Sequence, residues 1–231
     1  MTVTALSVAS FGVASSGVVG AGAIGYLCGT LPTADIVTRI ATKGTVNLRS
    51  EGSGNPGATN AAKVLGAKWG IVVLVIDIAK GVVAGFVGRA VGGDAGAYFA
   101  ATMSIAGHIF PVWSRFRGGI GVATSAGACL AVFPLYFPID VAVAALGAVA
   151  AKKAERATQL SGVAWCLAAG IWWRAKITNA WGPKPSWGLV AFAVVSTAMI
   201  LGKFAHARRA ADRARLDQVL RRADWMQRGK L

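Results

Sequence analysis

The chain carries little charge for its length. Charged residues make up 14% of the 231 positions, whereas apolar residues make up 55% and the mean hydropathy is +0.57. Residues 5–31 contain no Asp, Glu, Lys or Arg at all. Because a soluble domain has about 25% charged residues, this composition argues against that class and predicts a polytopic membrane protein.

Acidic residues and histidines are scarce as well. The chain has nine Asp and Glu and two His, too few carboxylates for a metal cage of oxygen ligands. Neither histidine has an Asp four residues later, and the sequence shows no Ser–His–Asp set and no cysteine nucleophile. We therefore expect no metal and no cofactor, and chemistry that does not rely on a strongly activated side chain.

The three cysteines have no paired spacing. Cys28, Cys129 and Cys166 lie inside apolar runs, without a His or Asp cluster beside them. This distribution argues against a zinc site and against a disulfide framework. We expect all three to be buried packing residues.

The chain has an excess of basic residues, with a net charge of +15. In a soluble protein this excess would indicate a nucleic-acid partner, but aromatic and basic residues are not interleaved here, so we expect no nucleic-acid binding. Apolar runs separated by Gly, Pro or charged residues predict seven membrane helices, near residues 5–31, 69–90, 95–113, 119–137, 139–153, 159–174 and 187–203.

The basic residues between these spans predict the orientation. With the first residue outside, only four basic residues face outwards: Arg89, Arg174, Lys176 and Lys184. The inner side then holds the basic residues of the 39–68 and 115–117 segments, Lys152, Lys153 and Arg156, and the whole C-terminal tail. Since basic residues collect on cytoplasmic loops, the N-terminus is predicted outside and the C-terminus in the cytoplasm.

The chain divides into a membrane domain, residues 1–203, and a basic cytoplasmic tail, residues 204–231. Apolar side chains recur in the tail at helical spacing: Leu216, Val219, Leu220 and Ala223. This pattern favours an interfacial helix on anionic lipid headgroups. A solvated and partly disordered tail is the alternative.

A glycine-rich polar loop, Glu51–Asn60, stands between two apolar runs and leads into a helix-like segment. Its glycines permit left-handed backbone and close approach, and its hydroxyls, amides and N–H groups can donate to an anion at a helix N-terminus. Thr59 or Asn60 can cap that helix, and Lys63 adds positive charge one turn later. A phosphate site is favoured over a plain turn, although the Gly-Lys-Ser/Thr ending of a P-loop is missing.

A second polar cluster joins Gly107–Pro111 to the basic turn Arg115–Gly119. Arginine suits phosphate through its planar donor fork, but a cytoplasmic anchor is the other interpretation of Arg117. His108 near a span end is more often a structural hydrogen-bonding residue than a base. Asp77 and Lys80 are three residues apart in a span, which predicts a structural ion pair lining the site, with a proton or ion relay as the alternative.

Three segments, taken in order along the chain, show a resemblance to a known family. They are Glu51–Asn60, Val73–Gly81, and Gly107–Pro111 leading to Phe116–Thr124. Together they resemble the bacterial acyl-phosphate:glycerol-3-phosphate acyltransferases of the PlsY type, from about residue 25 to residue 206.

The resemblance implies an all-α, seven-helix enzyme of the bacterial cytoplasmic membrane with its active site facing the cytoplasm. It implies transfer of a fatty acyl group from acyl phosphate to the 1-hydroxyl of glycerol 3-phosphate, giving lysophosphatidic acid and phosphate in phospholipid biosynthesis. The partners are then acyl phosphate, glycerol 3-phosphate and membrane lipids. The candidate substrate-binding residues are Ser53, Gly54, Asn55, Thr59, Asn60, Lys63, His108, Arg117, Arg156, Ser161 and His206.

The chain also departs from the family pattern. Ile120 stands where the family has a lysine, Lys63 replaces an arginine, and Arg209 replaces an asparagine after the histidine. Gln159 and Gly162 replace two serines. Two alternatives follow: a divergent member with a changed acyl donor or acceptor, or a non-catalytic membrane subunit or small transporter.

Overall fold

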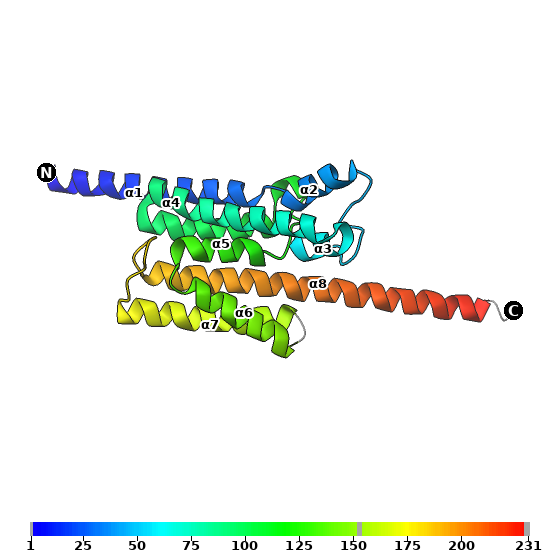
Figure 1. Ribbon diagram of the computed structural model, residues 1–231. Coiled ribbons are helices and arrows are strands. Elements are labelled where there is room, and N and C mark those ends of the chain that lie inside the picture. The colour runs from blue at the N-terminus through cyan, green and yellow to red at the C-terminus, as the bar shows by residue number, and fades with distance from the viewer. Residues whose placement is uncertain (1, 152–153, 229–231) are drawn as a thin grey trace.

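The computed structural model describes residues 2–151 and 154–228, and these residues form helices and connecting turns without a strand (Figure 1). The elements are α1 (Thr2–Gly29), α2 (Thr33–Thr42), α3 (Ala58–Leu65), α4 (Ala67–Ile109), the 3-10 turn η1 (Val112–Ser114), α5 (Val122–Val132), α6 (Phe137–Ala151), α7 (Ala154–Ala175) and α8 (Trp187–Arg228). The all-α prediction is confirmed for this part of the chain. Lys152, Lys153 and residues 229–231, which entered the charge pattern, lie outside it.

Three stretches of the described residues are long and apolar enough to cross a membrane: Ser16–Thr42, Ala67–Ser114 and Trp187–Arg221. Large apolar side chains also cover the outer surface of the bundle. Leu146 on α6 is 70% exposed and Leu167 on α7 is 64% exposed. Such side chains are unfavourable in water and favourable against lipid, so the outside of the bundle fits a hydrocarbon environment.

Helix α4 is a hairpin of two helical arms. Gly92 (φ −127°) and Gly93 (φ 63°, ψ −155°) leave the helical region, and the chain doubles back there. The two arms touch close to the turn, since Gly88 packs directly against Gly96 and Ala100. The break that the sequence predicts between residues 90 and 95 is therefore confirmed.

Small residues let the helices approach closely. A methyl group on Gly25 of α1 would overlap the backbone of Ala100 on α4, and one on Gly127 of α5 would overlap the carbonyl oxygen of Ile78. Close backbone contact of this kind is how membrane helices gain van der Waals attraction, because lipid offers no hydrophobic drive for their association.

Helix α5 is shorter than the predicted span 119–137. It has 11 residues, which corresponds to about 16 Å of helix. Residues up to Gly121 belong to the basic turn that precedes the helix, so α5 begins only after them. At the other end, Pro134 prevents the helix from continuing beyond Phe133. At its end, the Asn179 side chain donates to the Val132 carbonyl oxygen (3.2 Å) and the Trp181 indole donates to Leu130 (2.9 Å).

Two further helical segments differ from the sequence prediction. Helix α2 was not predicted, because its ten residues bury only one narrow face, including Ala34 and Val37. Helix α8 continues past the predicted end at residue 203 to Arg228. In Figure 1, α8 runs straight beyond the other helices, while α2 and α3 gather at the same end of the bundle, called here the α2–α3 end.

The close approach of α5 to α4 can be tested at Gly127. Gly127→Ala should lower the free energy of unfolding in detergent by about 1 to 3 kcal/mol, because the added methyl meets rigid backbone. Gly170→Ala on α7 is the matched control, since a methyl group there meets no atom within 4 Å. Thermal unfolding followed by tryptophan fluorescence measures both, and equal midpoints would contradict the packing described.

Candidate functional site

A polar pocket lies at the α2–α3 end. It is lined from the α1–α2 turn by Thr30 and Leu31, from the long loop before α3 by Arg49 and Pro56, and from α4 by Lys80 and His108. Two glycines that precede α5, Gly118 and Gly119, complete the lining. The pocket therefore joins the first two polar clusters that the sequence singled out.

The glycine-rich loop is organised around the Asn60 side chain, which is 2% exposed. Its amide nitrogen donates to the carbonyl oxygens of Leu48 and Glu51 (3.0 Å each), and its oxygen accepts from the Ser53 N–H (2.8 Å). Gly52 and Gly54 have positive φ (60° and 70°), so they allow the loop to turn tightly around this amide. Asn60 is thus a scaffold residue of the loop.

The predicted helix cap is wrong. The N-cap of α3 is Gly57, without a side-chain cap, and both Thr59 and Asn60 lie in the first helical turn. Asn60 is already committed to the loop, which explains why it does not cap. Ser53, Thr59 and Lys63 are exposed, whereas Gly54 and Asn55 are half-buried. The first N–H groups of α3 remain without intrahelical acceptors, as at any helix start.

The basic turn before α5 is pinned to the end of α4. The Gly118 N–H donates to Ile109 (3.0 Å) and the Gly119 N–H donates to His108 (3.1 Å). Arg115 (φ 51°) and Phe116 (φ 61°) adopt left-handed backbone, which is rare for residues with side chains. The backbone is held in this form by these two hydrogen bonds and by the tight packing of Gly118 on the His108 carbonyl.

His108 brings the two loops together. A methyl group on Gly119 would lie within 3.1 Å of the Pro56 carbonyl oxygen and would overlap the imidazole of His108. Only glycine leaves room for the ring between these backbones. His108 is 9% exposed, and its ring packs between the two loops.

Asp77 and Lys80 form the predicted ion pair inside the bundle. The distance between the Lys80 ammonium and the Asp77 carboxylate is 2.9 Å, and their side chains are 5% and 2% exposed. Lys80 also donates to the Leu31 carbonyl oxygen (3.4 Å), and the His108 ring nitrogen Nδ1 lies 3.6 Å from the carboxylate. The pair therefore links both arms of α4 to the α1–α2 turn.

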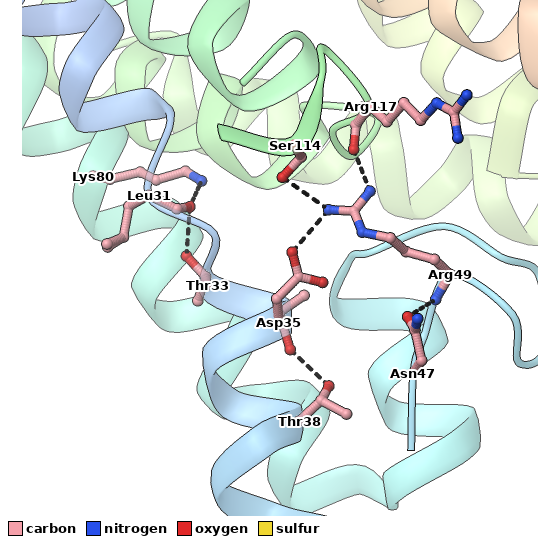
Figure 2. A network of polar contacts seen from close by, with 10 residues as sticks. Leu31, Thr33, Asp35, Thr38, Asn47, Arg49, Lys80, Ser114 and Arg117 are labelled. Carbon is pink, nitrogen blue, oxygen red and sulfur yellow. Dashed lines mark hydrogen bonds and ion pairs between the residues drawn. The ribbon is translucent and has the colours of Figure 1, made fainter. Parts of the chain in front are cut away.

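Arg49 is the centre of a second polar network (Figure 2). Its guanidinium pairs with Asp35 of α2 (2.8 Å), donates to the Ser114 hydroxyl of η1 (3.3 Å) and donates to the carbonyl oxygen of Arg117. Because the fork binds three segments at once, it fixes the basic turn against α2. The Arg117 side chain itself remains exposed.

Sequence analysis assigned no site role to Arg49 or Asp35. Arg49 lies shortly before the glycine-rich loop, and nothing in the sequence distinguishes it from the other basic residues there. Asp35 lies in α2, which was not predicted. Only the folded structure, in which α2 lies beside the loop that carries Arg49, shows that Arg49 and Asp35 form an ion pair.

Three of the candidate substrate-binding residues, Arg156, Ser161 and His206, lie apart from the polar pocket. Arg156 and His206 are exposed, and the Ser161 hydroxyl donates to the Asp140 carboxylate. Ser161 and Asp140 line a separate, mainly apolar cavity of about 200 Å³ between α5, α6, α7 and α8. The structure thus brings His108 and the glycine-rich loop together, and it does not place Ser161 in the same pocket.

A helical bundle with long apolar stretches and a polar pocket at one end is a polytopic membrane protein. Residues 19–213 match the family model described as glycerol-3-phosphate acyltransferase. The chain therefore belongs to that family.

Named relatives agree with the family match. A glycerol-3-phosphate acyltransferase of Thermoanaerobacter pseudethanolicus is 37% identical over 65% of this chain and 75% of its own length. One of Anaeromyxobacter dehalogenans is 37% identical over 74% of this chain and 84% of its own. The crystal structure of the integral membrane glycerol 3-phosphate acyltransferase PlsY, in its glycerol 3-phosphate form, superposes with a TM-score of 0.65 at 25% identity, covering 85% of this chain and 94% of that one. This protein is accordingly a membrane acyltransferase.

The buried ion pair can be tested by removing one or both charges. Asp77→Ala should destabilise the protein by about 3 to 5 kcal/mol, because it leaves the Lys80 ammonium buried without a partner. The double variant Asp77→Leu/Lys80→Met should recover most of that loss, since it buries no charge. Thermal unfolding in detergent measures both. A double variant as unstable as Asp77→Ala would contradict this account.

Two variants should distinguish residues that hold the glycine-rich loop in shape from residues that bind a ligand. Asn60→Ala removes three hydrogen bonds inside the loop, so it should lower the unfolding midpoint as well as activity. Ser53→Ala changes an exposed hydroxyl, so it should leave the midpoint unchanged. The same midpoint for both variants would show that Asn60 does not hold the loop.

Proposed function

We propose that the protein transfers a fatty acyl group from acyl phosphate to the 1-hydroxyl of glycerol 3-phosphate. The products are lysophosphatidic acid and inorganic phosphate, which makes this a step of phospholipid biosynthesis. The observation that carries the proposal is the junction of Pro56, His108 and Gly119, where the glycine-rich loop meets the basic turn in one polar pocket.

The chemistry needs positioning more than activation. The hydroxyl oxygen forms a bond to the acyl carbon, the bond between that carbon and the phosphate oxygen breaks, and phosphate leaves. A phosphate oxygen of the donor accepts the hydroxyl proton, so no side-chain base is required. Backbone N–H groups of the loop and nearby cations hold two anionic substrates together, which supplies orientation and electrostatic stabilisation.

Substrate contacts are assigned to three segments of the chain. Exposed donors at Ser53, Thr59 and Lys63 surround the glycine-rich loop, and Arg117 extends from the basic turn. His108 and Asn60 shape these two segments from inside. Arg156, Ser161 and His206 belong to α7 and α8, so their participation requires substrate to reach from the polar pocket towards those helices.

We place the site at the cytoplasmic face of a bacterial inner membrane. Counting each arm of α4 separately, we propose that seven helical segments cross the membrane, with the N-terminus outside and the C-terminus inside. The distribution of Lys and Arg supports this orientation, because the α2–α3 end holds far more of them than the opposite end.

The basic tail is proposed to contact anionic headgroups on the same side. Helix α8 continues through it, and Leu216, Val219 and Leu220 are each more than 50% exposed on one helical face. Glu155 of α7 pairs with Arg208 (3.4 Å) and ties the beginning of the tail to the bundle.

A changed acceptor is the second candidate function, and Ile120 favours it. Ile120 is half-buried and packs against the apolar core formed by α4, α5, α7 and α8. It therefore supplies no charge to the polar pocket, where an anionic acceptor would be expected to meet one.

The reaction is tested with purified protein in detergent, supplied with palmitoyl phosphate and glycerol 3-phosphate. We expect release of phosphate and formation of lysophosphatidic acid in equal amounts, detected by colorimetry and mass spectrometry. Ser53→Ala should lower turnover without unfolding the protein, because it removes one exposed donor beside the anion.

The outcome separates the alternatives. Turnover with another hydroxyl acceptor, but not with glycerol 3-phosphate, would favour the changed acceptor. No turnover with any donor or acceptor, together with a stoichiometric protein partner after purification, would favour a non-catalytic membrane subunit and would contradict the proposal.

A further inference from the structure

Lys203 lies on α8 beside the α2–α3 end of the bundle. Its ammonium is 5.8 Å from the ring centroid of Phe110, the residue that directly follows α4. The side chain is half-buried. Its ammonium lies within electrostatic range of the Arg49 guanidinium and the His108 ring, both of which line the polar pocket. Lys203 thus approaches the pocket from the helix that follows the whole bundle in sequence.

The two Lys and Arg residues that line the polar pocket are already paired with carboxylates. Lys80 pairs with Asp77 and Arg49 pairs with Asp35. Among the residues that the structure describes, Lys203 has no ion-pair partner. Glu155, the carboxylate that α7 offers to α8, is bound to Arg208 instead.

A half-buried ammonium without a counter-charge costs free energy, and here it also faces other positive charge. The ring of Phe110 offers only a weak cation–π attraction at this distance. A bound anion would remove both the desolvation cost and the repulsion between Lys203 and Arg49. An unpaired ammonium at this position does not stabilise the protein by itself, so binding of an anionic ligand explains its presence better.

Ile120 is a second reason to expect a cation from another helix near the polar pocket. The basic turn offers Arg115 and Arg117 as exposed side chains, but the next position that could carry a cation, residue 120, packs into the core. Positive charge on the α5 side of the pocket is accordingly limited. Lys203 adds a cation close to His108 from a different helix.

We infer that Lys203 is a substrate-binding residue that contacts a phosphate group bound next to the polar pocket. The inference rests on the proposed function, because it takes the ligand to be a phosphate monoester or an acyl phosphate. The Lys203 ammonium is a point charge with three hydrogen-bond donors, so it can bind a phosphate oxygen in several geometries. The sequence motifs do not include Lys203, since it lies before His206 inside an apolar span.

The test compares Lys203→Met, Lys203→Arg and the control Lys184→Met. Methionine keeps the length of the side chain and removes the charge, whereas arginine keeps the charge. Lys184 is exposed in the loop between α7 and α8, and its known contacts use only its backbone. KM and kcat are measured for both substrates, together with inhibition by inorganic phosphate.

Lys203→Met should raise the KM for one substrate about tenfold, as expected for a lost charge-assisted hydrogen bond, and should weaken inhibition by inorganic phosphate to a similar extent. Lys203→Arg should restore most of the affinity. A rise confined to glycerol 3-phosphate assigns the residue to the acceptor, and a rise confined to palmitoyl phosphate assigns it to the donor. Lys184→Met should behave as the unaltered protein.

Two results would overturn the inference. One is an active protein whose KM values and phosphate inhibition are the same with Lys203→Met. The other is a Lys203→Arg variant as impaired as Lys203→Met with an equally lowered unfolding midpoint, which would make the residue structural. If the unaltered protein is inactive, titration calorimetry with inorganic phosphate decides separately: weaker binding by Lys203→Met supports the inference, and unchanged or undetectable binding contradicts it.

Discussion

The α2–α3 end of the bundle depends on one buried ion pair, Asp77 with Lys80. An isolated charge would be costly at this depth, so each residue is tolerable only because the other is present. The pair also reaches outwards, since Lys80 holds the Leu31 carbonyl of the α1–α2 turn and Asp77 lies beside His108. His108 in turn sets the path of the two glycines before α5. A contact inside the hydrocarbon-facing bundle thus determines the shape of loops at its surface.

Positive charge at this end serves two purposes. Lys80 and Arg49 are neutralised by carboxylates, and they fix the positions of helices and turns. Lys203 and Arg117 have no described ion-pair partner and are available to anions. In the proposed reaction, the acyl phosphate donor already contains a good leaving group, so unneutralised charge at defined positions is more useful than a reactive side chain.

The sequence predicted the helices better than the contacts between them. Apolar runs separated by Gly, Pro or charged residues predicted the break inside α4 and the long apolar helices, because both signals are local. Asn60 was expected to cap α3, but its side chain instead holds the loop from the first turn of that helix, and the ion pair of Arg49 with Asp35 was not predicted. Ser161 resembled a pocket residue, yet Asp140, twenty-one positions earlier, binds it. These differences arise from contacts between distant segments, which no local pattern records.

The shortness of α5 has a consequence for where the two substrates can meet. A hydrocarbon core is about 30 Å thick, and the 11 residues of α5 cover only about half of it. In the proposed orientation, α5 therefore cannot carry the turn with Gly118 and Gly119 from one headgroup plane to the other, and we propose that the turn lies below the headgroups. In that arrangement the proposed acyl phosphate donor can keep its chain among the lipid tails while its carbonyl is at the pocket, and glycerol 3-phosphate enters from the water.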